Sequence, residues 1–88
     1  MTERVVTIQN KNGLHARPSA EIVKAAAKFK SEITLIRDDL EVNGKSIMGV
    51  MMLAAECGAS IVLRAQGDDA EQALDAIATL IANKFGER

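Results

Sequence analysis

The sequence is poor in residues on which several classes of protein depend. It has one cysteine, Cys57, so no disulfide can form within the chain, and this usage suits a reducing compartment. It has two phenylalanines and no tyrosine or tryptophan, which removes the aromatic platforms on which single-stranded nucleic acids stack. Its single histidine leaves too few ligands for a typical zinc site. These shortages argue against a disulfide scaffold, a nucleic-acid binder and a metal protein.

An excess of one charge and a long apolar run are missing as well. Eleven basic and twelve acidic residues give a formal net charge of -1, so no overall field would attract nucleic acid. No apolar run approaches the roughly 20 residues that cross a bilayer. The first residues lead directly into a strand-like segment, without the basic and apolar regions of a signal peptide. We therefore expect one soluble cytoplasmic domain over residues 1–88, with no membrane insertion.

Hydrophobic periodicity predicts seven elements in the order β-α-β-β-α-β-α. Alternating or β-branched segments are expected to form strands over 4–8, 32–36, 40–42 and 60–66. Segments with apolar residues three, four and seven positions apart are expected to form helices over about 16–29, 46–58 and 68–86. So many elements in 88 residues favour a two-layer α+β open-faced sandwich, a four-stranded antiparallel sheet with three helices covering one face.

The third predicted helix has the clearest boundary signals. Asp68 and Asp69 are capping candidates, and Glu71 and Gln72 follow three residues later, at the spacing of a capping box. The end of this helix is expected to fray near residues 85–86. Its apolar stripe consists of Ala70, Ala73, Leu74, Ile77, Leu80 and Ile81.

Segment 12–19, NGLHARPS, places the single histidine, His15, at the start of the first predicted helix. Pro18 falls in the first turn, where its missing N–H breaks no helical bond. The first amides of a helix carry partial positive charge and stabilise anions such as phosphate. Arg17 adds a planar fork of donors, and the positive helix end favours a neutral imidazole with a lone pair free for attack. The segment therefore suits phosphoryl transfer.

Position alone leaves other roles for His15 open. A lone histidine at a helix start is about as often a simple helix cap as it is a functional residue. A metal site lacks further ligands, and a serine-histidine hydrolase lacks both a nucleophile elbow and room for a substrate cleft. The local chemistry makes phosphoryl transfer attractive without deciding it.

Two motifs connect the chain to a known family. Residues 13–18, GLHARP, resemble the active-centre signature of HPr, the histidine-containing phosphocarriers of the bacterial sugar phosphotransferase system. Residues 45–51, KSIMGVM, resemble the regulatory serine site of the same family. The spacing of the motifs, the element order and the length also resemble the family, so the similarity covers essentially the whole chain.

The resemblance implies a role for each residue of the first motif. His15 would accept a phosphoryl group at Nδ1 from phosphorylated enzyme I, whose donor is phosphoenolpyruvate, and pass it to an EIIA protein. Arg17 would stabilise the phosphate, and the amides of Ala16 and Arg17 would lie close to it. The protein would be a carrier rather than an enzyme, with no cofactor and no metal.

Ser46 has two predicted roles. As a serine before a helix it is a favoured N-cap. By resemblance it is also the target of an HPr kinase/phosphorylase, with a transcriptional regulator as a further partner. A phosphate there would act through its charge beside the docking surface rather than by disrupting the helix. Gly49, where some relatives carry lysine, favours the kinase-regulated group.

The second predicted helix has two apolar stripes, and a short peripheral helix cannot bury both. One stripe is expected to pack on the sheet, with Cys57 buried or half-buried; it consists of Val50, Leu53, Ala54 and Cys57. The other is expected to stay exposed, and the resemblance implies that it docks partner proteins; it consists of Ile47, Met48, Met51 and Met52. Lys24 and Lys45 are expected to add a basic rim that recruits acidic partners.

Two alternative functions remain at this point. One is a regulatory phosphocarrier of the nitrogen-related branch, which would keep the His15 chemistry but report metabolic state. The other is an interaction or ligand-binding module without phosphorylation, a class that commonly acts as dimers. We expect a monomer.

Overall fold

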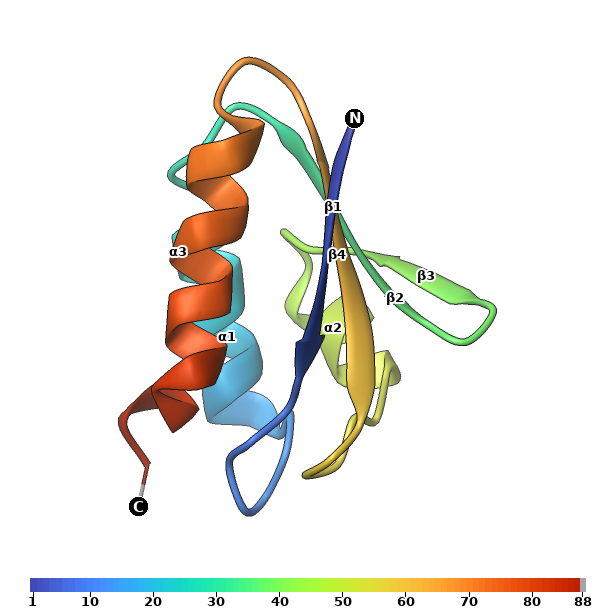
Figure 1. Ribbon diagram of the computed structural model, residues 1–88. Helices are drawn as coiled ribbons and strands as arrows, with labels where there is room; N and C mark the ends of the chain where they lie inside the picture. Colours follow the sequence, from blue (N-terminus) through green and yellow to red (C-terminus); the bar gives the residue numbers. More distant parts are fainter. Residues whose placement is uncertain (88) are drawn as a thin grey trace.

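The computed structural model describes residues 1–87, which form a sheet with helices layered on one side of it (Figure 1). All neighbouring strands are antiparallel, in the order β1-β4-β2-β3. The strands are β1 (Thr2–Thr7), β2 (Glu32–Arg37), β3 (Leu40–Asn43) and β4 (Ser60–Gln66). The helical segments are α1 (Ala16–Ala26), α2 (Ile47–Met52), α3 (Ala70–Ala82) and the 3-10 turn η1 (Lys84–Gly86). The predicted fold class and element order are confirmed.

The core lies between the sheet and the helices. On β4 the alternate residues Ile61, Leu63 and Ala65 are buried, as expected for a strand with one face against helices. On α3 the predicted apolar stripe is buried except for Leu80, which is partly buried. Each fully buried leucine or isoleucine contributes about 1.5–3 kcal/mol. In this shared core, α3 packs against β1 and β4, and α1 packs against α2 and α3.

Two helices end earlier than their apolar patterns predict. Helix α1 ends at Ala26, with Ala27 as its C-cap, because the amides of Lys28 and Phe29 bond to carbonyls three residues back and form a tighter turn. Helix α2 ends at Met52 because Ala54 adopts a left-handed conformation, with φ of 49°. The Arg37 guanidinium donates to the carbonyls of Leu53 and Ala54, which satisfies this helix end.

The early end of α2 makes the prediction for Cys57 wrong. Val50 and Leu53 are buried as expected, but Ala54 and Cys57 are exposed. The helical spacing that placed them on one stripe no longer applies after Met52. The Cys57 thiol lies on the surface, with Sγ 3.7 Å from the carbonyl oxygen of Gln9.

The capping box predicted for α3 is also wrong. Asp69 is the N-cap residue, but its side chain does not cap the helix. Its carboxylate instead accepts hydrogen bonds from the amide of Lys30 at 2.9 Å and from the amide and hydroxyl of Ser31. The Ser31 hydroxyl, followed by the amide of Lys30, holds the pKa of Asp69 below its ordinary value. Asp69 thus joins the start of α3 to the chain entering β2.

Helix α3 ends at Ala82, before residues 85–86 where it was expected to fray, and those residues belong to the turn η1. Phe85 is only 5% exposed and packs into the core. Lys84 and Phe85 both have φ of 56°, so the chain turns sharply after α3. Figure 1 shows this end of the chain at the same end of the molecule as the loop between β1 and α1. The turn therefore brings Glu87 to the residues that precede α1.

Candidate functional site

The loop before α1 is held by contacts that only glycine permits. Gly13 has φ of 69°, and a methyl carbon added to it would lie 2.3 Å from the carbonyl oxygen of Ala55. The next amide, of Leu14, donates to that same oxygen at 2.8 Å. The hydroxyl of the buried Ser19 donates to the Leu14 carbonyl at 3.2 Å. These contacts fix the backbone on both sides of His15.

His15 is the N-cap residue of α1, as predicted, but its side chain does not cap the helix. The first helical hydrogen bond runs from the amide of Ser19 to the His15 carbonyl, at 3.0 Å. Pro18 has no N–H, so the amides of Ala16 and Arg17 are the donors that helical geometry leaves at this end. This end of α1 therefore has two amides and a partial positive charge available to an anion.

The His15 ring makes its hydrogen bond with a residue from the other end of the chain. Its side chain is 41% exposed, and Nε2 lies 3.0 Å from Oε2 of Glu87. Arg17 Nη2 donates to the same carboxylate oxygen at 3.0 Å and lies 3.4 Å from the Phe85 carbonyl. Asn10 Nδ2 donates to Oε1 of Glu87 at 3.0 Å. Chiefly through the Asn10 hydrogen bond, and also through His15 and Arg17, the pKa of Glu87 is lowered.

Comparison with known proteins identifies this arrangement. A family model described as "PTS HPr component phosphorylation site" matches residues 2–83. The chain belongs to the HPr family. Phosphocarrier protein HPr of Cupriavidus necator is 49% identical over 99% of this chain and 98% of its own. Phosphocarrier protein HPr of Treponema pallidum is 51% identical over 99% of both.

A solved structure of an HPr protein has the same fold. The crystal structure of HPr-C-His from Thermoanaerobacter tengcongensis matches with a TM-score of 0.96 and 49% identity, covering 100% of this chain and 99% of that one. Such similarity over whole chains places the present protein among the phosphocarriers of the phosphotransferase system.

Ser46 lies where the family resemblance expects the regulatory serine, and its predicted capping role is confirmed. It is the N-cap of α2, and its hydroxyl accepts a hydrogen bond from the amide of Gly49 at 3.1 Å. The serine is half-buried. The helix that it caps packs against α1, and the chain that follows it contacts Gly13 and Leu14. Ser46 and His15 therefore lie on elements that touch.

The second apolar stripe of α2 is exposed, as predicted. The exposed fractions range from 41% to 77%, although each side chain is large and apolar. The residues are Ile47, Met48, Met51 and Met52. We call these four residues the methionine face. Since α2 packs against α1, this face lies beside the helix that carries His15.

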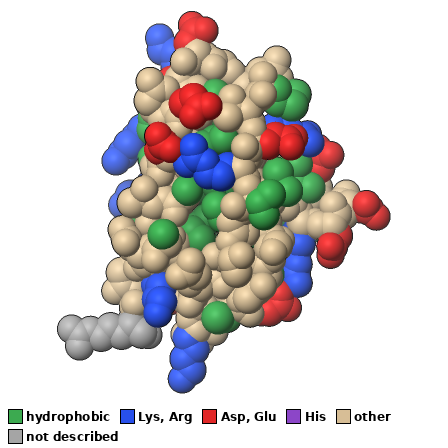
Figure 2. Space-filling view, viewed as in Figure 1, with side chains coloured by type: hydrophobic (Ala, Val, Ile, Leu, Met, Phe, Trp, Pro, Cys, Tyr) green, Lys and Arg blue, Asp and Glu red, His purple; other side chains and the backbone are tan. Residues whose placement is uncertain are grey.

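The two lysines of the expected basic rim are not brought together. Lys24 lines a shallow groove between α1 and α3, with Glu21 and Lys28. Lys45 lies at the start of α2, and its ammonium donates to the carbonyl of Phe29 at 2.8 Å. On the face seen in Figure 2, acidic and basic side chains lie among one another. The rim is therefore two separate positive charges rather than one basic patch.

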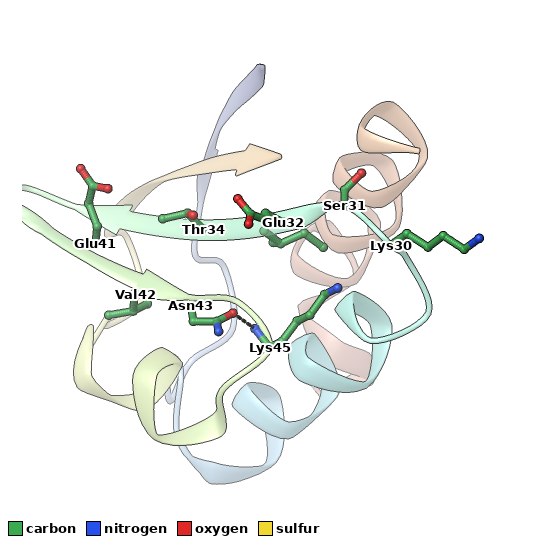
Figure 3. A pocket seen from close by; sticks show the side chains of 9 residues that line it. Lys30, Ser31, Glu32, Thr34, Glu41, Val42, Asn43 and Lys45 are labelled. Carbon is green, nitrogen blue, oxygen red and sulfur yellow. Dashed lines mark hydrogen bonds between the residues drawn. The ribbon is translucent and has the colours of Figure 1, made fainter. Parts of the chain in front are cut away.

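A hollow on the surface lies away from His15. Its volume is about 410 Å³, and its lining comes from β2, β3 and the segments next to them. In Figure 3, Glu32 and Thr34 lie on one side, Val42 and Asn43 on the other, with Lys30 and Lys45 at the rim. Neither His15 nor Arg17 lines it. The His15 ring is thus on the surface, outside this hollow, where a second protein can reach it.

Residues 1–87 include no group of three histidine, cysteine, aspartate or glutamate side chains placed to hold a metal ion. Among the same residues, no helix has the length and apolar character needed to span a membrane.

Sequence reasoning missed two residues of the site, Asn10 and Glu87. Asn10 stands in a turn segment, where asparagine is common for local reasons, and Glu87 stands more than 70 positions from His15. Neither has a motif or a period that marks it. The pairing depends on the sharp turn of the chain at Lys84 and Phe85. A sequence without glycine at those two positions does not predict the positive φ angles of this turn.

Proposed function

We propose that this chain accepts a phosphoryl group on His15 from phosphorylated enzyme I and donates it to EIIA proteins in the cytoplasm, as a step in sugar uptake. The observation that carries this proposal is the uncapped start of α1, where an exposed imidazole lies beside two free amides. Membership of the HPr family supports the same role.

The chemistry needs only the ring and its surroundings. The Nδ1 lone pair attacks phosphorus, an N–P bond forms, and the bond between phosphorus and the donor group breaks with its electron pair. The amides of Ala16 and Arg17 and the Arg17 guanidinium stabilise the phosphoryl oxygens. In the transfer to EIIA, a nucleophile of that protein attacks phosphorus, the N–P bond breaks, and its electron pair returns to Nδ1 of His15. The chain then holds no phosphoryl group and can accept another from the donor, which is the cycle of a carrier.

Partner docking is assigned to the methionine face of α2 together with the segment after His15. Methionine side chains are flexible and polarizable, so one surface can fit several partners. Lys24, in the groove between α1 and α3, and Lys45, at the start of α2, are separate positive charges that would speed the encounter with acidic surfaces. The arrangement suits a protein that meets both a donor and an acceptor through the same site.

Regulation is assigned to Ser46, with an HPr kinase/phosphorylase as the modifying enzyme and a transcriptional regulator as a reader of the phosphorylated form. The hydroxyl is half-buried and bonded to Gly49, so modification requires this cap to open. The added charge of about -1.5 to -2 would lie beside the methionine face and change which partners dock there.

The proposal is tested by incubating the protein with phosphoenolpyruvate and a bacterial enzyme I and recording its intact mass. We expect one acid-labile phosphoryl group on the wild type and none on His15→Ala. The matched control is Ser46→Ala, which should still gain the group because Ser46 is not the acceptor. No gain with enzyme I from several bacteria would overturn the proposal.

A further inference from the structure

The carboxylate of Glu87 lies at the centre of a cluster of three donors. One oxygen accepts from Asn10 Nδ2, and the other lies 3.0 Å from both His15 Nε2 and Arg17 Nη2. The Glu87 side chain is only 15% exposed, although its neighbours His15 and Arg17 are largely open to solvent. Three convergent hydrogen bonds on one shielded carboxylate indicate a built contact rather than a chance surface pair.

This contact determines which ring nitrogen carries the proton. An ionised carboxylate can only accept hydrogen bonds, so Nε2 of His15 must be the donor. In the neutral ring the other nitrogen, Nδ1, then holds the free lone pair. That is the nitrogen at which the proposed function places the phosphoryl group.

Asn10 is arranged to hold the carboxylate. It is 1% exposed, and its amide group donates both to Glu87 and to the carbonyl of Gly13, the latter at 2.8 Å. Its own oxygen, Oδ1, is buried without a partner in residues 1–87. If the amide group were turned over, Oδ1 would face two acceptors, the Gly13 carbonyl and the Glu87 carboxylate. The orientation is therefore fixed, although it leaves Oδ1 buried without a hydrogen bond. From the other side, buried Phe85 and the bond from the Glu87 amide to the Lys84 carbonyl anchor the turn.

We propose that Glu87 is a positioning residue for phosphoryl transfer, which holds the His15 ring with Nε2–H toward its carboxylate and Nδ1 toward the donor. This role rests on the proposed function. When the Nδ1–P bond forms, the proton stays on Nε2 and the ring gains positive charge. The adjacent carboxylate stabilises that charge, as a carboxylate does for an imidazolium in hydrolase triads. Arg17 has five N–H donors, enough to bond the Glu87 carboxylate and the phosphoryl oxygens at the same time.

The substitution Glu87→Gln, with a control at another carboxylate, separates this positioning role from a general effect of losing one negative charge. A glutamine amide presents one oxygen and one NH2 group, whereas every partner of Glu87 at this point is a donor. One of the three donors must then face NH2. When that donor is His15, the ring lone pair moves to Nε2 and the proton to Nδ1, which blocks attack. The matched control is Glu71→Gln, which removes an exposed carboxylate 3.9 Å from Arg4 at the opposite end of α3.

The experiment measures two quantities on the full chain. The 15N chemical shifts of the His15 ring at about pH 8, where an imidazole is neutral, report the tautomer. The initial rate of phosphorylation by enzyme I reports transfer. We expect the wild-type ring to be protonated on Nε2 and the ring of Glu87→Gln to be a mixture of tautomers. The phosphorylation rate of Glu87→Gln should be roughly tenfold lower than that of the wild type, the order expected from one lost charge-assisted hydrogen bond. Glu71→Gln should match the wild type in both.

Unchanged ring shifts or an unchanged rate in Glu87→Gln would overturn the role of Glu87. A loss of rate that Glu71→Gln shares would overturn it as well, because net charge would then be the cause. A wild-type protein that accepts no phosphoryl group would overturn the proposed function instead, and the ring shifts would still decide whether Glu87 holds the tautomer.

Discussion

The starts of α1 and α2 have similar backbones and opposite side-chain arrangements. Both N-cap residues, His15 and Ser46, have an extended conformation. Ser46 turns its hydroxyl onto the amide of Gly49, whereas His15 turns its ring away, toward Glu87. The first arrangement stabilises its helix, and the second leaves the amides of the helix open. The difference shows how a site can be made by omitting a cap.

The start of α3 is a third variant. Its N-cap carboxylate, that of Asp69, is also turned away from the helix, but it is bonded to Lys30 and Ser31 rather than left near an open surface. It therefore joins two parts of the fold. Among the three α-helix starts in residues 1–87, that of α1 alone combines an uncapped end with an exposed histidine ring.

The largest effect is expected from His15→Ala. This change removes the acceptor nitrogen, so phosphorylation by enzyme I should disappear completely, while the ring's surface position makes the effect on folding small. Intact mass and thermal denaturation check the two expectations. A large fall in the denaturation midpoint would assign the histidine a structural role and break the comparison.

The next effect concerns the backbone before α1. Gly13→Ala should lower the free energy of unfolding by about 1–2 kcal/mol from its left-handed φ alone, with a further cost because the methyl carbon would meet the Ala55 carbonyl. Gly58→Ala is the matched control, since Gly58 also has positive φ but open space around it. Chemical denaturation should place Gly13→Ala clearly below Gly58→Ala. Equal losses would show that the Ala55 contact does not constrain the loop.

A smaller effect tests the missing cap directly. His15→Ser should be more stable than His15→Ala by about 1 kcal/mol, because serine caps the helix end that histidine leaves open. Ser46→Ala should lose about the same amount at α2. Both differences are measured by urea denaturation. If His15→Ser and His15→Ala are equally stable, the start of α1 is not short of a cap.

The smallest effect is expected in acid and concerns Asp69. The pKa of its carboxyl is lowered in the folded protein from the ordinary value of 3.8. The hydrogen bonds of the carboxylate therefore contribute fully to the free energy of unfolding above pH 3.8, and this contribution is lost as the pH falls through the folded pKa. Below about pH 4, stability should therefore fall more steeply in the wild type than in Asp69→Asn. Denaturation midpoints of both proteins, measured across this pH range, check the prediction. Midpoints that fall equally steeply with pH in the two proteins would contradict it.

Local signals and long-range contacts explain what the sequence could predict. The Ser46 cap, the stripe of α3 and the position of His15 depend on neighbours within a few residues, and the structure confirms all three. The errors at Asp69 and Phe85 have another origin. The Asp69 carboxylate bonds to Ser31, far away in the sequence, and Phe85 is buried in the core. Tertiary contacts overrode local preference there.

The same reasoning applies to the site. The motif predicts His15 and Arg17 as neighbours in the site because both stand at the start of one helix. Glu87 and Asn10 are joined to them only by the folded chain, and no spacing rule connects positions so far apart. The exposed methionine face was predictable because α2 is too short to bury two stripes.

The central claim is that His15 carries a phosphoryl group between two proteins. The most direct test isolates the phosphorylated protein, free of enzyme I, mixes it with an EIIA protein and follows the intact mass of both. The account predicts that this chain loses one phosphoryl group as EIIA gains one, faster than the group is lost without EIIA. Loss at the same rate with and without EIIA proteins from several bacteria, with none of them gaining mass, would contradict it.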